Sequence, residues 1–175
     1  ELARGFDPTH LVRSPARFDP VQLEVWQRDA VHRLTLDEAC VWLGAHKPEQ
    51  VADDAWRAFA QVVQANLILP ADVTPWVQAI FGDEIELDDE GRSIITAAGN
   101  AFFEAAASAA DEAGNDWKAL SQRVKELTGK KGPELFKPLR YALTGQGHGP
   151  ELAPLLALLT PERVRSRLAR WSSAT

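Results

Sequence analysis

The chain has one cysteine and no methionine among its 175 residues. A single cysteine excludes an internal disulfide and a multi-thiolate zinc site. Cys40 lies in the apolar stretch 39–43, which favours a core thiol over a nucleophile. The lack of methionine suggests that the sequence begins inside a longer chain. No apolar run approaches the roughly 18 residues needed to cross a bilayer, and no amino-terminal signal pattern is present. A reducing, cytoplasmic setting with no membrane partner is therefore expected.

The residues also lack a recognisable catalytic arrangement. The four histidines, at positions 10, 32, 46 and 148, are dispersed, and no two have the i, i+4 spacing of a metal-binding helix. No phosphate-binding Gly-x-x-x-x-Gly-Lys-Ser/Thr sequence occurs. The acidic runs 83–84 and 88–90 are interpreted as solvated loop rather than as a cation site. The sequence thus predicts no catalytic, cofactor-binding or metal site in this chain.

Charge is distributed unevenly along the chain, although its net value is −6. From Asp116 onward there are eleven basic and five acidic residues, a net charge of +6. Residues 1–115 have eight basic and twenty acidic residues, a net charge of −12. This asymmetry indicates a partner for the basic end.

Hydrophobic periodicity predicts an all-helical fold, because no credible pair of strands occurs. The expected helices are 20–33, 35–44 (opened by a Thr35/Glu38 capping box and stopped by Gly44 in a left-handed conformation), 48–67, a short one from Thr74, 93–113, one capped by Asn115 or Asp116, 133–144, a short one from Pro150, and one from Thr160 to about Trp171.

The acidic stretch 81–91 is the expected boundary between two small helical subdomains. We therefore predict a connector over residues 1–19, a first subdomain over 20–85 and a second over 86–175.

Basic side chains line several of the expected helices. On a helical wheel of 133–144, the leucines 135, 139 and 143 share one side, while Lys137, Arg140 and Thr144 share the other. The helix runs into the glycine-rich segment 145–150, which another chain can approach closely. In the last helix Arg163, Arg167 and Arg170 form a stripe, and Lys118 aligns with Lys125. These faces suit a phosphate backbone, but cations near a helix carboxy terminus are also common on plain solvated faces.

Residues 129–152, GKKGPELFKPLRYALTGQGHGPEL, resemble a signature near the carboxy terminus of bacterial glutamyl-tRNA synthetases. In that family a segment with lysine and glycine is followed by Pro-Leu-Arg, an aliphatic pair, Thr-Gly and often Gly-Pro-x-Leu. Residues 13–19, with Leu23, resemble the connector that follows the family's KMSKS loop. Three departures are Gln27 in place of Asn, Gly149 where some relatives have a hydroxyl, and Lys137 in place of an apolar residue.

The resemblance implies an all-helical, anticodon-binding cage, without the catalytic domain that holds the HIGH and KMSKS motifs. ATP and Mg²⁺ would then belong to the parent enzyme, a glutamate–tRNA ligase, and this chain would have no cofactor. Its partners would be the anticodon loop of a glutamate-accepting tRNA and the parent's catalytic domain. The expected RNA-binding residues are Arg140, Thr144, Gly149, Leu152, Lys137, Lys131, Arg163 and Arg167. The alternative is an all-helical protein-interaction module that uses the acidic half.

Overall fold

The computed structural model of the chain describes residues 19–172, and all regular structure in that range is helical. The α-helices are α1 (Pro20–Arg33), α2 (Leu36–Trp42), α3 (Asp53–Val63), α4 (Thr74–Phe81), α5 (Asp89–Ala98), α6 (Asn100–Ala113), α7 (Trp117–Thr128), α8 (Pro133–Thr144), α9 (Leu152–Leu156) and α10 (Pro161–Ala169). Short 3₁₀ turns occupy Gly44–His46, Gln64–Asn66 and Pro70–Val73. The all-helical prediction is confirmed.

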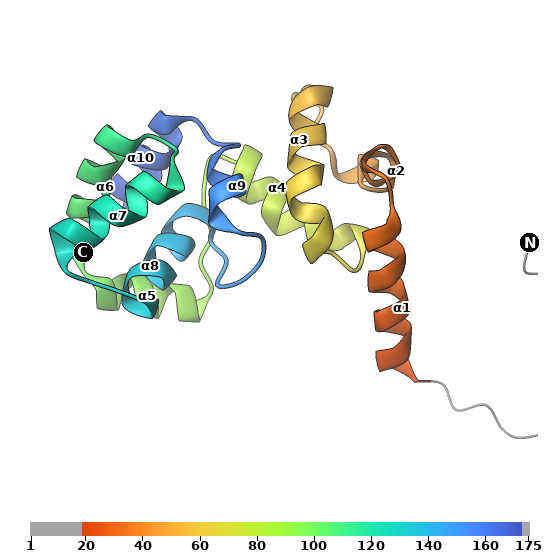
Figure 1. Cartoon of the computed structure of the whole chain (residues 1–175), viewed down its shortest axis with the longest axis horizontal. Coiled ribbons are helices and arrows are strands. Elements are labelled where there is room, and N and C mark those ends of the chain that lie inside the picture. Colours follow the sequence, from red (N-terminus) through yellow and green to blue (C-terminus); the bar gives the residue numbers. More distant parts are fainter. Residues whose placement is uncertain (1–18, 173–175) are drawn as a thin grey trace, which may run out of the picture.

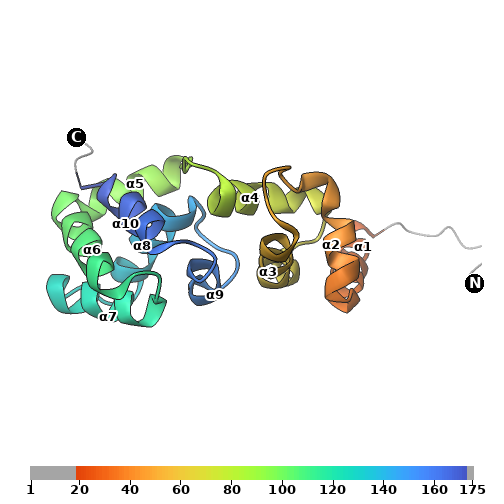
Figure 2. The same ribbon diagram turned by 90° about the horizontal axis from the view of Figure 1, so that it is seen from above.

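The helices form an elongated arrangement (Figure 1). Helices α1 to α3 lie at one end, α5 to α8 and α10 at the other, and α4 and α9 lie between the two groups in both views (Figures 1 and 2). One continuous apolar cluster includes buried residues from both ends, such as Trp56 and Phe59 of α3 and Leu168 of α10. The division at residues 85–86 stays a prediction.

Side-chain caps begin four helices where the sequence indicated. The Asp19 carboxylate accepts hydrogen bonds from the backbone N–H groups of the first turn of α1. Thr35 and Glu38 form the expected capping box at α2. Asp116 caps α7 and Thr160 caps α10. Each cap satisfies a backbone donor that has no partner within its helix.

Three helix predictions differ from the structure. The expected helix 93–113 is two helices, because Gly99 adopts a φ of 78° between α5 and α6. The break lets α5 pack on α8 while α6 packs on α7 and α10. Gly44 is not a left-handed stop either: α2 ends at Trp42, and Gly44 begins a 3₁₀ turn without a positive φ. The expected helix 48–67 is shorter, with α3 occupying only Asp53–Val63.

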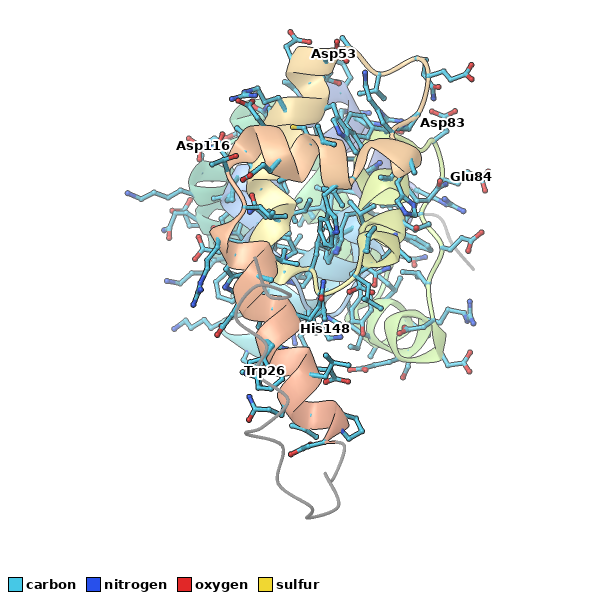
Figure 3. All side chains as sticks on the ribbon, turned by 90° about the vertical axis from the view of Figure 1, so that its right-hand side faces the viewer. Trp26, Asp53, Asp83, Glu84, Asp116 and His148 are labelled. Atoms are coloured by element: carbon cyan, nitrogen blue, oxygen red, sulfur yellow. The ribbon has the colours of Figure 1, made fainter. Side chains whose placement is uncertain are left out.

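Helix α1 exposes apolar side chains near the amino end of the described residues. Val21 is 68% and Trp26 is 63% exposed, and Val31 is the only buried residue of this helix. In Figure 3, Trp26 lies on the part of α1 that extends away from the other helices. The predicted connector lies outside the described residues apart from Asp19. No helix within residues 19–172 is long and apolar enough to cross a membrane.

Candidate nucleic-acid interface

Helix α8 has the two-sided character expected from its sequence. Leu135, Leu139 and Leu143 are at most 2% exposed and belong to the core. Lys137 is exposed, and Arg140 is half-buried. Pro138 lies inside the helix and removes one backbone donor from its second turn. The helix ends at Gly145, which adopts the left-handed conformation with a φ of 73°.

The Arg140 guanidinium uses only part of its hydrogen-bonding capacity within the described residues. Its Nη2 donates to the backbone oxygen of Pro150 at 3.1 Å. Its Nη1 is buried and has no hydrogen-bond partner among the described residues, and no carboxylate in that range pairs with the guanidinium. Burial lowers the pKa of Arg140. A partly desolvated cation with an unused donor strongly favours an added hydrogen-bond acceptor.

The glycine-rich segment 145–150 folds against this chain's own side chains. A Cβ on Gly147 would lie 2.4 Å from the Tyr141 hydroxyl oxygen, and one on Gly149 would lie 2.1 Å from the Trp76 ring. Gly149 also has a φ of 129°, where other residues are strained. Packing against α4 and α8 therefore accounts for these glycines. Gly147, His148 and Gly149 remain exposed on their other side.

Two predicted site residues are buried. Thr144 is 3% exposed, and its hydroxyl donates to Arg140 O at 2.7 Å and accepts from Gln146 N at 3.1 Å. The expectation that Thr144 faces solvent is wrong, because the chain turns back over the last turn of α8. Leu152 is 5% exposed at the start of α9 and packs into the core. Thr144 therefore contacts the backbone of Arg140 directly, whereas Leu152 belongs to the core.

Arg163 and Arg167 do not form an open basic stripe on α10. Arg163 donates to the backbone oxygens of Ile80 at 3.2 Å and Gly82 at 2.6 Å, and also pairs with Asp83 at 3.1 Å. Arg167 is 6% exposed and donates to Leu143 O at 2.8 Å and Gly82 O at 3.3 Å. The expected stripe is wrong because α10 packs against both α6 and α8, which buries a wide arc of the helix.

These two arginines hold the segment after α4 against α8 and α10. Burial, with a smaller contribution from the nearby Arg163 charge, lowers the pKa of Arg167 to about 10. In Figure 3, Asp83 and Glu84 lie at the edge of the molecule, on the segment after α4.

The remaining predicted cations lie on the surface. Lys131 is exposed in the turn between α7 and α8 and has no ion pair within the part of the chain that the structure describes. Lys137 Nζ lies 3.8 Å from Glu90 Oε1, a weak exposed contact. Lys118 and Lys125 of α7 are also exposed. Residues 117–140 carry seven basic and two acidic side chains.

Hydrogen bonds therefore join Arg140 to Pro150 of the 145–150 segment and to Thr144. Leu152 follows two residues after Pro150, and Arg163 and Arg167 bind backbone oxygens at the ends of α4 and α8 instead of lying on an open face. The Trp76 ring of α4 packs closely against Gly149. The sequence does not indicate this contact, because no local pattern connects positions 73 residues apart. Among residues 19–172, no group of three or more acidic, histidine or cysteine side chains is placed to hold a metal ion.

Comparison with known proteins identifies the type of domain. The family model described as an anticodon binding domain matches residues 30–171. Glutamate–tRNA ligase 2 of Nitrosococcus oceani is 46% identical over 167 residues, which are 95% of this chain and 35% of that protein. Glutamate–tRNA ligase 1 of Halorhodospira halophila is 44% identical over 171 residues, or 97% of this chain and 35% of that protein.

A solved structure has the same fold. The glutamate–tRNA synthetase of Elizabethkingia anophelis matches with a TM-score of 0.72 and 16% identity, over 97% of this chain and 34% of that one. The chain thus spans about a third of the length of the relatives it matches. The comparisons give no support to a protein-interaction module. The chain belongs to the anticodon-binding domain family, and it corresponds to the carboxy-terminal region of glutamate–tRNA ligases.

Proposed function

We propose that this chain binds the anticodon loop of a glutamate-accepting tRNA and so positions that tRNA for glutamylation by the parent protein's catalytic part. The observation that carries the proposal is the environment of Arg140, whose buried Nη1 has no acceptor and whose charge has no carboxylate partner within residues 19–172. Two donors of a guanidinium can meet one base edge or one phosphate with matched geometry.

Single-stranded loops are the parts of RNA that proteins read most readily, because unstacked bases expose their hydrogen-bonding edges. An anticodon base would enter beside the 145–150 segment, and one of its acceptors would bind the Arg140 guanidinium once Nη1 becomes accessible. Gly149 and Leu152 would border the base, while Thr144 would hold the end of α8 in place. Lys131 and Lys137 would attract the phosphates without regard to sequence.

Arg163 and Arg167 take a different role in this proposal. Their guanidinium groups bind backbone oxygens at the end of α4 and at the end of α8. They would therefore fix the position of α4 relative to α8. They act on RNA through the placement of the site rather than by direct contact.

The parent's catalytic part would bind ATP, Mg²⁺ and glutamate, and this chain would supply only tRNA placement. The exposed apolar side chains of α1 lie at the amino end of the described residues, where the rest of the parent would join. A helix with so much exposed apolar surface is suited to contact with that part.

The test is a titration of the chain with a fluorescently labelled glutamate-accepting tRNA transcript and with the same transcript altered in its anticodon. We expect tighter binding of the unaltered tRNA and an affinity that falls linearly with salt on logarithmic axes. Equal affinity for both transcripts would refute anticodon recognition, and the salt slope would then report charge attraction alone.

A further inference from the structure

We infer that Phe136 of α8 is a stacking surface for a second nucleobase of the same RNA loop, next to the base that Arg140 contacts. The inference rests on the proposed function and deepens it by adding a binding residue. Its basis is the position of Phe136, its exposure, its aromatic neighbour and the charge around it.

Phe136 lies on the same side of α8 as Arg140. The two positions are four residues apart, which corresponds to a rise of about 6 Å and a rotation of about 40° around the helix axis. Side chains spaced in this way are neighbours on a helix surface. A strand of RNA that reaches Arg140 therefore passes close to Phe136.

The ring of Phe136 is only partly covered. The residue is 45% exposed, whereas the leucines at 135, 139 and 143 in the same helix are at most 2% exposed. Trp117, at the start of α7, lies 5.9 Å from Phe136 between ring centroids, with the ring planes at 48°. Trp117 is partly buried and packs against the core, so it supports the phenyl ring from a fixed position. An aromatic ring held in this way can receive a base at low entropic cost.

The charge around this pair of rings suits RNA better than protein. Lys118 follows Trp117 directly, and Lys131 lies in the turn that leads into α8; both are exposed. Lys130 is also exposed but is paired with Glu134 at 3.3 Å. Aromatic side chains surrounded by cations bind single-stranded nucleic acid, because bases stack on the rings while the cations attract the phosphates.

A packing role for Phe136 makes a different prediction. If the ring only fills the space beside Trp117, leucine would replace it with little effect on RNA, because leucine is apolar and has a similar volume. If the ring stacks on a base, leucine would fail and tyrosine would succeed, because tyrosine keeps the aromatic face.

The experiment compares the wild-type chain with Phe136→Leu, Phe136→Tyr and Val41→Ala, the last a control at an exposed apolar residue of α2. Each is titrated with the glutamate-accepting tRNA transcript and with its anticodon stem-loop carrying 2-aminopurine at one loop position at a time. The melting temperature (Tm) of each variant is measured in parallel. We expect Phe136→Leu to weaken binding by about tenfold and to abolish the change in 2-aminopurine fluorescence at one loop position. Phe136→Tyr and Val41→Ala should bind as the wild type does.

Unchanged affinity and fluorescence in Phe136→Leu would overturn the inference and leave Phe136 as a packing residue or a contact for protein. The proposed function would survive that result if the wild type still distinguished the anticodon. A wild type that failed to bind the transcript would overturn both. If Phe136→Tyr lost affinity as Phe136→Leu does, at equal Tm, stacking would also be refuted.

Discussion

Replacement of Arg167 by alanine tests the way in which α10 joins the segment after α4 to α8. The guanidinium of Arg167 is buried and donates to the backbone oxygens of Leu143 and Gly82. Its Nε has no partner among the described residues. The sequence alone places this side chain in an exposed stripe, so the two descriptions predict very different costs for its removal.

The expected loss of stability combines three contributions. Two hydrogen bonds from a charged donor contribute about 1.5–3 kcal/mol each. Loss of two buried methylenes, Cγ and Cδ, adds about 2 kcal/mol. Removal of a poorly solvated charge returns about 3 kcal/mol, the free energy that corresponds to the lowering of the Arg167 pKa to about 10. The net expectation for Arg167→Ala is a loss of about 2–5 kcal/mol.

Thermal unfolding followed by circular dichroism measures this loss. A chain of this length loses about 2–4 °C in Tm for each kcal/mol, so Arg167→Ala should lower Tm by roughly 4–20 °C. Arg165→Ala is the matched control, because Arg165 lies on the same helix in an exposed ion pair with Asp111. Such a pair contributes less than about 1 kcal/mol. Equal, small shifts in both variants would refute the buried position of Arg167.

Three further predictions concern the stability of individual elements. Leu139→Ala, at a position with no exposed surface, should cost about 2–5 kcal/mol in a denaturant titration; a loss below 1 kcal/mol would contradict its place in the core. Asp116→Ala removes the cap of α7, whose carboxylate accepts from Ala119 N at 3.0 Å; it should cost about 1 kcal/mol in the same titration, and no loss would contradict the cap. The backbone N–H and then the hydroxyl of Thr35 lower the pKa of Glu38, so its stabilising effect is complete above the ordinary pKa and is lost as pH falls through the lowered value. The difference in Tm between wild type and Glu38→Gln should therefore shrink below about pH 4, and a constant difference would contradict this assignment.

The sequence predicted best the features that depend on near neighbours in the chain. The starts of α1, α2, α7 and α10 follow from caps within three residues of the groups that they satisfy. The break at Gly99 was missed because one glycine in an alanine-rich stretch is compatible with a continuous helix. The break is favoured by packing, since α5 and α6 bury their apolar sides against different helices.

The site, like the fold, was predictable only where it depends on residues close together in the sequence. Helical periodicity placed Arg140 away from the buried leucines of α8, and the structure has it half-buried beside the 145–150 segment. Periodicity failed for Thr144 and Arg167, because their partners come from other segments: Gln146 beyond the end of α8 for Thr144, and Gly82 and Leu143 for Arg167. No wheel drawn for one helix contains that information.

A double-mutant cycle between Arg140 and the anticodon tests the central claim most directly. The affinity of wild type and Arg140→Ala is measured for the unaltered transcript and for transcripts with one anticodon base replaced at a time. We expect wild type to discriminate at one base by about 1–3 kcal/mol and Arg140→Ala to lose most of that discrimination at the same base only. Effects of protein and RNA changes that simply add at all three bases would contradict the account.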